Sequence, residues 1–434
     1  MTVARMWHAL GERARRDDPI RVALVGAGQM GQGLAATLGR LPGMRLLAVA
    51  DLDLERARRA LHHAGAAPSN VTEALTDRAA QAALARGCAV ATTIPDIIPG
   101  VPVDVVVDAT GDPLQAALTA VRAIEARRHI VLLSVEADVT VGHVLASRAR
   151  EAGVVYTGAA GDEPAATKEL VDFARFVGFE VICAGKGKNN PLDRSATAAS
   201  LAAEARAKGM NPRMLAEFVD GTKTMVEMAC LANATGLVPD VRGMHGARAS
   251  AAELARVFVP VHDGGVLTRR GVVDFAMGVA PGVFVVIHTD HPILQDELRY
   301  LKIGDGPHFA LYRPYHLASI ETPLSIAAAA LCGEATIAPA GPPRAEVVTM
   351  AKRALREGDR LELPGEATVY GLIESAEIAA EEGLLPIGLA PDAEVLVDMA
   401  PHQPIRWRDV RVRPTPLLKL RSEQDRMFAL EVNR

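Results

Sequence analysis

Short apolar runs alternate with amphipathic segments over the first third of the chain. The runs are rich in Val, Ile and Leu, as expected of buried parallel strands. Between two of them, Leu114, Leu118 and Val121 recur at helical spacing. Strands are predicted at residues 20–25, 46–50, 103–107, 129–133 and 154–156. Strands that alternate with helices of this length indicate an α/β fold with a doubly wound parallel sheet.

The pattern changes after this region. Ala-rich segments predict helices at 195–208 and 214–234, and isolated strands are predicted at 180–184 and 283–287, which indicates an α+β domain. The Pro/Gly-rich stretch 338–343 is the best linker candidate, and short β-like runs follow it through residue 412. A chain of 434 residues is too long for one hydrophobic core. We therefore expect three domains, at 1–156, 157–338 and 339–434.

Composition excludes several classes of function. Hydrophobic residues make up 49% and charged residues 23%, and the net charge of −5 leaves no positive excess for binding nucleic acid. No stretch reaches the roughly 18 apolar residues of a membrane span, and the charged N-terminus does not resemble a signal peptide. We expect a cytoplasmic protein with neither nucleic-acid nor membrane partners. The four cysteines are scattered without a CxxC pair and are interpreted as buried free thiols.

A glycine-rich motif directly follows the first predicted strand. Gly26, Gly28 and Gly31 form G-x-G-x-x-G, with Gln29 and Met30 opening the next helix. The first glycine permits a tight turn, the second lets backbone amides approach a pyrophosphate, and the third allows close helix packing. The helix N-terminus adds partial positive charge. This context predicts a Rossmann domain that binds NAD or NADP; a simple glycine turn is the competing interpretation.

The choice of cofactor depends on the end of the second strand. Asp51 lies twenty residues after Gly31, where a carboxylate can accept both ribose hydroxyls and repel a 2′-phosphate. That feature favours NAD. Arginines follow closely at positions 56, 58 and 59, and one of them can accommodate NADP, so both cofactors remain open.

Two later strand ends belong to the same predicted site. Thr110 and Gly111 close one strand and Ser134 closes the next. Such strand ends line the crevice where a nicotinamide binds. Alternatively, Thr110 and Gly111 only form a turn before the next helix.

Candidate catalytic residues lie in the second predicted domain. Lys186 and Lys188, with flexible glycine neighbours, can hold an anion or polarise a carbonyl during hydride transfer; an exposed basic loop is the alternative. Asp220, Lys223 and Glu227 have the spacing of one helical face. That face can relay a proton to a carbonyl oxygen, or it is an ordinary solvated ion-pair face.

A further candidate site combines an arginine with a histidine. Arg313 and His316 lie beside two tyrosines in an aromatic-poor chain. The arginine can clamp an anionic substrate and the histidine can serve as acid or base. A buried structural corner explains the same cluster.

No metal-ligand motif is found. Asp162 and Glu163 precede Pro164, which suits the first turn of a helix, so these carboxylates are interpreted as caps. His288, Asp290 and His291 lack a further ligand at recognisable spacing. A divalent ion therefore has no motif to support it.

These motifs together resemble the homoserine dehydrogenase-like proteins with a C-terminal SAF domain, a group that includes 1-deoxy-D-xylulose 5-phosphate reductoisomerase-like enzymes. The resemblance covers nearly the whole chain. The β-clip SAF module is matched by the tail from about Ala345. The resemblance is carried by VGAGQMG at 25–31, GDEP at 161–164, GKGK at 185–188, LYRPYHL at 311–317, TVYG at 368–371 and LPIGL at 385–389.

The resemblance implies a three-domain homodimer in which an NADPH-binding domain precedes a catalytic, dimerising region. It also implies reduction of a sugar-phosphate-like carbonyl, coupled in the reductoisomerase-like branch to a rearrangement that needs a divalent ion. Homoserine dehydrogenases proper usually carry an Asn-Lys pair after the strand that matches residues 129–134, whereas this chain reads Ser134-Val135-Glu136. That difference disfavours homoserine dehydrogenase activity. SAF modules elsewhere bind sugar-like or polyol ligands, and a similar ligand for this chain is inferred by analogy alone.

The sequence thus predicts an NAD(P)H-dependent reductase of a small, polar, anionic carbonyl compound, with its chemistry in the cleft between the first two domains. Oxidation of a hydroxy amino acid, as in homoserine dehydrogenases, is the alternative among enzymes. The alternative of another class is a non-catalytic nucleotide-sensing protein that retains the Rossmann domain.

Overall fold

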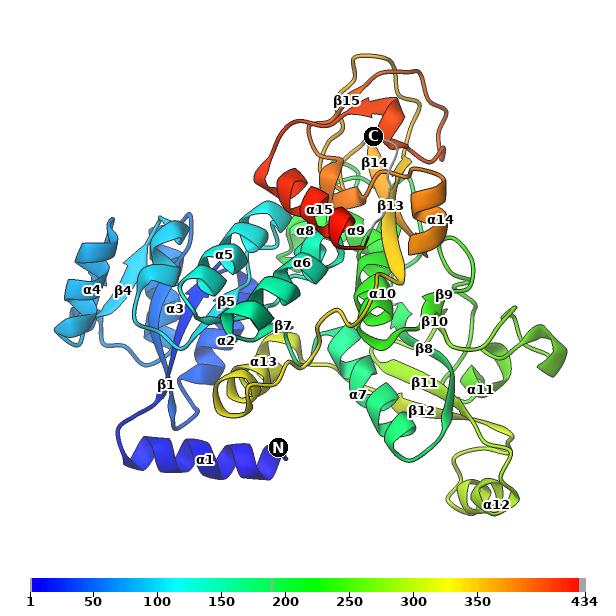
Figure 1. The fold of residues 1–434 in the computed structure, drawn as a ribbon, viewed down its shortest axis with the longest axis horizontal. Helices are drawn as coiled ribbons and strands as arrows, with labels where there is room; N and C mark the ends of the chain where they lie inside the picture. Colours follow the sequence, from blue (N-terminus) through cyan, green and yellow to red (C-terminus); the bar gives the residue numbers. More distant parts are fainter. Residues whose placement is uncertain (1, 189, 429–434) are drawn as a thin grey trace. The chain divides into compact units, whose positions relative to one another are not determined.

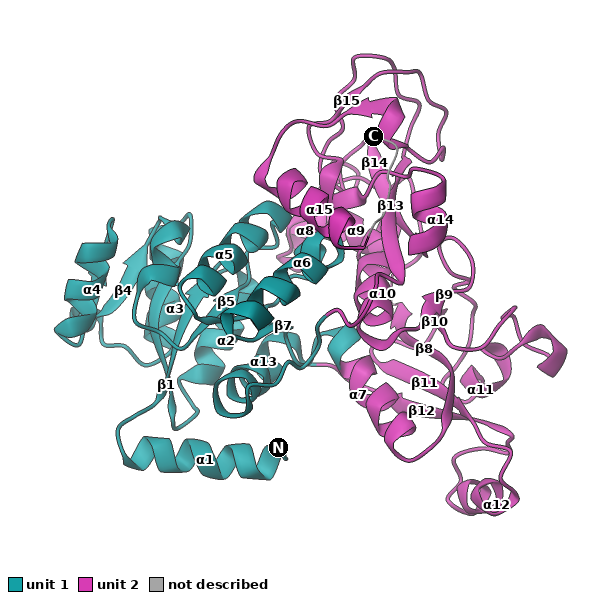
Figure 2. Cartoon of the chain, viewed as in Figure 1, with its two compact units in different colours: residues 1–165, 317–338 teal, residues 166–316, 339–434 magenta. Residues whose placement is uncertain are grey.

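The computed structural model describes residues 2–188 and 190–428 (Figure 1). They form two compact units (Figure 2). Unit 1 comprises Met1–Ala165 and Leu317–Ala338, and unit 2 comprises Ala166–His316 and Pro339–Arg434. The chain therefore passes between the units three times. The three domains expected from the sequence stay a prediction, since the two compact units have different boundaries.

Unit 1 is built on a parallel sheet with the strand order β3-β4-β2-β1-β5-β6-β7. The order reverses between β1 and β5, which is the switch point of a doubly wound sheet. The predicted Rossmann fold is confirmed. Within the described residues the strands are β1 (Ile20–Val25), β2 (Met44–Ala50), β3 (Val71–Glu73), β4 (Ala89–Thr92), β5 (Val105–Asp108), β6 (His129–Leu132) and β7 (Tyr156–Gly158).

Helices from two separate parts of the chain pack on this sheet. Ile326 and Ala327 of the helix α13 join the apolar core of unit 1. Gly33 of α2 approaches α13 so closely that an added Cβ would lie 2.7 Å from Ser319 Oγ. Residues 317–338 are therefore an integral part of unit 1. The helices are α1 (Val3–Arg15), α2 (Gln29–Leu38), α3 (Leu54–His63), α4 (Asp77–Ala85), α5 (Pro113–Glu125), α6 (Glu136–Ala152) and α13 (Ala318–Ala327).

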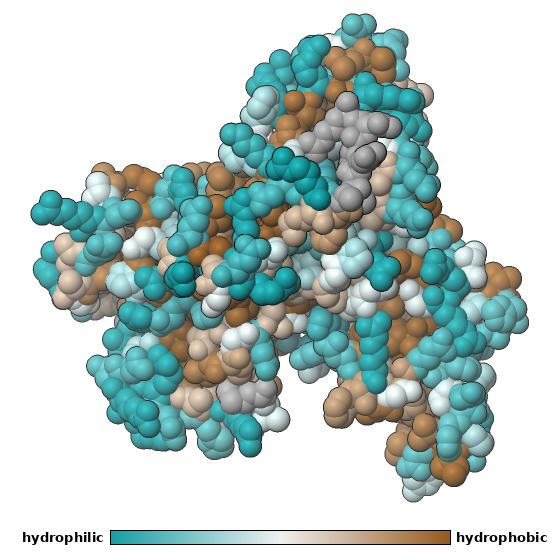
Figure 3. Space-filling model, in the orientation of Figure 1, coloured by the Kyte–Doolittle hydropathy of each residue, from teal (hydrophilic) through white to brown (hydrophobic). Residues whose placement is uncertain are grey.

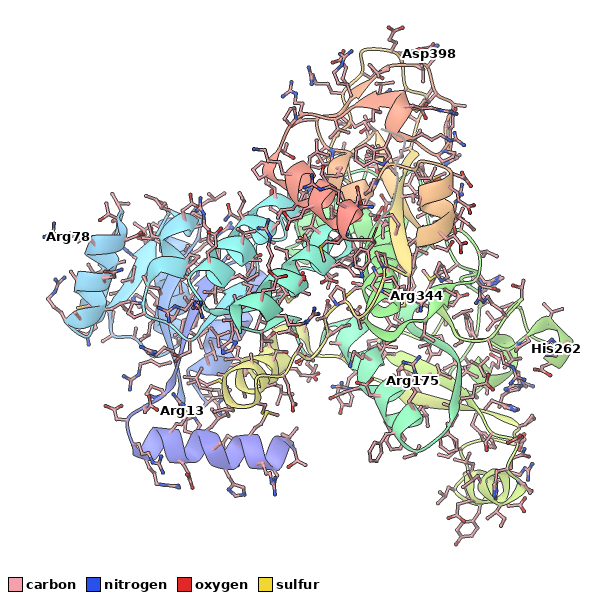
Figure 4. The ribbon with its side chains drawn as sticks, viewed as in Figure 1. Arg13, Arg78, Arg175, His262, Arg344 and Asp398 are labelled. Carbon is pink, nitrogen blue, oxygen red and sulfur yellow. The ribbon has the colours of Figure 1, made fainter. Side chains whose placement is uncertain are left out.

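Unit 2 contains a mixed sheet with the order β12-β11-β8-β10-β9. The central strand β8 pairs parallel with β10 and antiparallel with β11. Arg175 of α7 (Glu163–Phe176), labelled in Figure 4, donates to the carbonyl of Thr235 at 2.8 Å and ties that helix to the end of α10. The strands are β8 (Glu180–Lys188), β9 (Val238–Pro239), β10 (Val272–Met277), β11 (Val283–His288) and β12 (His308–Arg313).

Two predicted helices of unit 2 differ from the structure. Residues 195–201 form turns, and only α8 (Ala202–Lys208) is helical. The helix predicted at 214–234 is two helices, α9 (Pro212–Asp220) and α10 (Thr222–Thr235), because Gly221 adopts a left-handed φ of 88°. A residue in that conformation ends a helix. Two further helices are α11 (Leu254–Val257) and α12 (Pro292–Tyr300).

The C-terminal segment is rich in short strands, as predicted, and belongs to unit 2. The hairpin of β13 (Ala345–Ala351) and β14 (Val369–Ser375) contacts α10, as Figure 1 shows. The amide of Gly371 donates to Thr222 Oγ1 at 2.9 Å and fixes this contact. The remaining elements are α14 (Ala376–Glu381), the pair β15 (Glu394–Val395) and β16 (Val410–Arg411), and α15 (Pro416–Met427).

The surface in view in Figure 3 is mostly hydrophilic, and the four cysteines are free thiols. Figure 3 shows hydrophilic side chains over much of the face in view, interrupted by smaller apolar areas. Cys183 and Cys230 are buried free thiols as predicted, whereas Cys88 and Cys332 are only partly buried. No helix in the described part of the chain is both long and apolar enough to cross a membrane.

Candidate active site

The glycine motif forms the tight connection between β1 and α2. Gly26 has a φ of 93°, and a Cβ at Gly31 would lie 2.2 Å from the carbonyl oxygen of Gly26. Gly28 precedes α2, and no heavy atom lies within 4 Å of the place where its Cβ would stand. The free space beside Gly28 and the helix N-terminus together fit a dinucleotide pyrophosphate. Gln29 and Met30, also predicted here, are exposed in the first turn of α2.

Asp51 directly follows β2, as predicted, and is held against the glycine motif. Its Oδ2 accepts from the amide of Ala27 at 2.7 Å, and its Oδ1 accepts from the amide of Asp53 at 2.9 Å. Each carboxylate oxygen has a second lone pair, so Asp51 can still accept from a ribose hydroxyl. Arg56 of α3 forms an ion pair with Asp53, which caps this helix, and Arg58 forms one with Glu55.

The three other predicted cofactor residues lie together at the ends of β5 and β6. The amide of Gly111 donates to Ser134 Oγ at 3.0 Å. Thr110 donates through its hydroxyl and its amide to Asp108 Oδ1, at 2.8 and 3.2 Å. Asp108 is fully buried, which raises the pKa of its carboxyl to about 7 against the opposing hydrogen bonds from Thr110. No pattern in the sequence singled out this aspartate.

Lys186 and Lys188 lie on the central strand of unit 2, beyond the strand end that the sequence predicted at residue 184. β8 extends to Lys188 because Gly185 and Gly187 allow close packing. A Cβ at Gly185 would lie 2.0 Å from the backbone carbonyl oxygen of Asp274, and a Cβ at Gly187 would lie 1.7 Å from that of Val279. The glycines therefore serve close approach, not flexibility. Because side chains alternate along a strand, both lysines project from the opposite face. Each is only 5% exposed, which rules out the alternative of an exposed basic loop.

Helices α9 and α10 supply the partners of these lysines. Lys186 Nζ forms a buried ion pair with Glu227 of α10, and Lys188 Nζ donates to the carbonyl of Phe218 in α9. Burial and repulsion from Lys186 lower the pKa of Lys188 to about 8, although the carboxylates of Asp220 and Glu227 oppose the shift. An ammonium group with such a pKa can give up a proton near neutral pH.

The predicted helical face of Asp220, Lys223 and Glu227 is wrong in one respect. Asp220 ends α9, while Lys223 and Glu227 belong to α10, since Gly221 interrupts the helix. Asp220 accepts from the amide of Thr222 at 2.8 Å and from Lys352 Nζ at 2.9 Å. Burial raises the pKa of Asp220 and the ammonium of Lys352 opposes this.

Sequence reasoning missed Lys352. It follows β13 directly, is buried, and also donates to the carbonyl of Ala196 at 2.7 Å. A single lysine at the end of an apolar strand was the only available signal. Its partner Asp220 lies 132 residues earlier, a separation that periodicity cannot bridge.

Arg313 ends β12 on the same face of the sheet as Lys186. Val283 of β11 lies opposite Lys186 on one side and opposite Arg313 on the other. Side chains at directly paired positions share a face. Arg313 Nη1 forms an ion pair with Glu169 of α7 at 2.9 Å, and its guanidinium lies 4.5 Å from the ring centroid of Tyr315. His316 is partly buried three residues later.

The interpretation of Asp162 and Glu163 as helix caps without a metal stays a prediction. Glu163 opens α7 with Pro164 beside it, which agrees with the helix start predicted there. The rings of His288 and His308 pack with centroids 4.8 Å apart, and His308 Nε2 lies 3.2 Å from Asp263 Oδ2.

Two family models match this chain in separate regions. Residues 26–157 match the model described as the NAD-binding domain of homoserine dehydrogenase. Residues 161–322 match the model described as the catalytic domain of oxidoreductase DRL. The glycine motif lies in the first region, and Lys186, Lys188 and Arg313 lie in the second. No curated protein sequence matches the chain.

Several solved structures are similar at low identity. A probable dehydrogenase from Thermotoga maritima is 15% identical, with 73% of this chain and 90% of that chain covered and a TM-score of 0.41. A putative myo-inositol dehydrogenase from Sinorhizobium meliloti 1021 is 16% identical, with 73% and 90% covered and a TM-score of 0.39. Biliverdin reductase from Synechocystis sp. PCC 6803 is 20% identical, with 41% and 50% covered and a TM-score of 0.26.

The Rossmann sheet, its glycine motif and the two family models define the class of the protein. It is an NAD(P)-dependent oxidoreductase. The sequence-based predictions of an enzyme and of NAD or NADP as cofactor are confirmed. Within the class, the region that carries the buried lysines is similar to the catalytic domain of oxidoreductase DRL.

Proposed function

We propose that this oxidoreductase reduces a small, polar, anionic carbonyl compound of the sugar-phosphate type, using Lys186 and Lys188 of unit 2. The observation that carries the proposal is the burial of both lysines on one face of the central strand, opposite carboxylates of α9 and α10. Buried ammonium groups are costly and are retained where their charge or proton is used.

The side chains divide the work of reduction. The carbonyl carbon receives hydride from the reduced nicotinamide. Lys188 donates a hydrogen bond and then a proton to the carbonyl oxygen, which its pKa of about 8 permits. Lys186 is held by Glu227 and polarises the same oxygen. Arg313 and His316 orient the anionic end of the substrate, while Asp220 and Lys223 return a proton to Lys188.

Turnover with a panel of carbonyl compounds tests this function. The purified protein is offered neutral aldehydes, ketose phosphates and 2-oxo acids with NADH or NADPH, and homoserine with NAD or NADP, and nicotinamide absorbance is followed. We expect oxidation of the reduced cofactor with an anionic carbonyl compound. Lys188→Met should lower kcat/KM by about 10²-fold or more, since it removes the acid.

The control is Lys208→Met, which removes an exposed lysine paired with Glu204 on α8. It should leave kcat/KM unchanged. Turnover of homoserine alone would replace carbonyl reduction by oxidation of a hydroxy amino acid. Tight cofactor binding without any turnover would contradict the catalytic role of the lysines. A rearrangement of the carbon skeleton, which the reductoisomerase-like resemblance implies, is checked by identifying the product.

A further inference from the structure

Arg194 has an unusual environment in unit 2. Its guanidinium carbon lies 5.2 Å from the centroid of the Tyr370 ring, a cation–π contact with a tyrosine of β14. Tyr370 is itself buried, and its hydroxyl lies 3.1 Å from Nδ1 of His402. The C-terminal segment therefore supplies a rigid platform for the arginine.

The aromatic ring does not satisfy the donors of this arginine. A guanidinium donates its hydrogen bonds in its own plane, whereas a ring beneath it contacts only the face. Nη1 of Arg194 is buried and has no hydrogen-bond partner among the described residues. A buried donor of a charged group is costly unless an acceptor reaches it.

The nearby carboxylates are already engaged. Asp220 accepts from the Thr222 amide through Oδ1 and from Lys352 through Oδ2. Glu227 is paired with Lys186. Within the described residues, Nη1 of Arg194 therefore keeps a donor position that a bound ligand can fill.

Charged groups of this cluster interact with Arg194. Arg194 and Lys188 are close enough to repel each other, and Asp220 attracts both. Because a second cation lies near Arg194, an anion at its unpartnered donor is favoured.

We propose that Arg194, positioned by Tyr370, binds the oxyanion group of the substrate, a phosphate or a carboxylate. The inference rests on the proposed function and adds to it the residue that selects an anionic substrate. It also gives the C-terminal segment a role at the site: Tyr370 orients Arg194, and Lys352 occupies the Asp220 carboxylate that would otherwise neutralise the arginine. Tyr370 and Lys352 are positioning residues.

Calorimetric titration of the full-length protein with inorganic phosphate, and separately with acetate, tests the site. Saturating NADP is present throughout so that the cofactor site cannot take up the probe. We expect at least one probe to bind the wild-type protein, and Arg194→Met to weaken it by about tenfold or more. Arg194→Lys should recover part of the affinity, because lysine keeps the positive charge. The recovery should be incomplete, because lysine lacks the paired donors of the planar guanidinium. Tyr370→Leu should weaken binding through loss of the platform.

Arg206→Met is the matched control, since Arg206 is an exposed arginine of α8, and it should bind like the wild type. An unchanged circular dichroism spectrum and melting temperature in each variant show that the protein is folded. Phosphate binding without acetate binding assigns a phosphate-bearing substrate, and the reverse assigns a carboxylate; both support the role of Arg194. Equal affinity in Arg194→Met and wild type, or no binding of either probe, would overturn it.

Turnover separates this inference from the proposed function. If Arg194→Met lost anion binding while no carbonyl compound was reduced by the wild type, the anion site would stand and the proposed reduction would fail. If the wild type reduced an anionic carbonyl compound and Arg194→Met had the same KM, the reduction would stand and the role of Arg194 would fail.

Discussion

At the scale of single residues, Asp108 makes the stability of unit 1 depend on pH. Its buried carboxyl has a pKa raised to about 7, so the protonated form stabilises the fold. This stabilisation is complete below the unfolded pKa of about 4 and is lost as pH rises through about 7. Between about pH 5.5 and pH 8.5 the loss amounts to about 2 kcal/mol. Asp108→Asn stays neutral, so relative to the wild type it should gain stability at the higher pH.

Urea unfolding at both pH values measures this difference. Asp290→Asn, at an exposed aspartate, is the control and should follow the wild type. A variant that differs from the wild type equally at both pH values would show that Asp108 does not titrate in this range.

Lys188 gives the reaction its own pH dependence. Its pKa, lowered to about 8 by burial and by repulsion from Lys186, means that the proton donor is lost as pH rises through that value. We expect kcat/KM to fall about tenfold per pH unit above it. Lys188→Arg should be slower but lack this fall, because arginine stays protonated. A pH–rate profile at saturating reduced cofactor is the measurement, and a fall that persists in Lys188→Arg would assign the titration to another group.

Single residues were predicted well only where a local pattern marked them. Lys186 and Lys188 stand out in the sequence because two glycines flank them, and the structure places both beside carboxylates. Lys352 and Arg194 carry no local pattern. Their environments depend on Asp220 and Tyr370, and contacts between such distant segments arise only from tertiary packing.

At the scale of elements, Gly28 and Gly31 of the β1–α2 connection should respond differently to alanine. A Cβ at Gly28 meets no protein atom within 4 Å, so Gly28→Ala should fold normally yet weaken cofactor binding by about tenfold or more. A Cβ at Gly31 would lie 2.2 Å from the Gly26 carbonyl oxygen, so α2 must shift at a cost of about 1–3 kcal/mol. Melting temperatures without cofactor and NAD(P) affinities separate the two effects.

Gly11→Ala, in the open interior of α1, is the control: it should leave NAD(P) affinity unchanged and raise stability by up to about 1 kcal/mol, because alanine favours the helix. Equal loss of stability in Gly28→Ala and Gly31→Ala would contradict the different roles given to these glycines.

The elements that sequence predicted best are the buried strands of unit 1. β1, β2, β5 and β6 were located within two residues at each end because nearly continuous apolar runs mark them. β3 and β4 were missed, since Val71–Glu73 is very short and Ala89–Thr92 is weakly apolar. In unit 2, glycines misled in both directions: the strand predicted at 180–184 was ended before Gly185, although β8 continues to Lys188, and Gly221 was passed over where it ends α9.

At the scale of the whole molecule, cofactor and substrate anion should act on different compact units. The cofactor motif belongs to unit 1, whereas Lys186, Lys188 and Arg194 belong to unit 2. A ligand slows amide exchange where it binds, since opening must first release it. Hydrogen exchange should therefore show NADP protecting peptides around residues 26–31 and 108–111. Adding phosphate should then protect peptides around residues 180–188 and 190–195.

Two variants make this a double test. Gly28→Ala should lose the protection by NADP in unit 1 and keep the phosphate effect in unit 2, and Arg194→Met should show the reverse. The two effects should separate because the glycine motif belongs to unit 1, whereas Lys186, Lys188 and Arg194 belong to unit 2. If Arg194→Met abolished protection by NADP in unit 1 as well, the two ligands would share one site, and phosphate would be a mimic of the cofactor instead of the substrate.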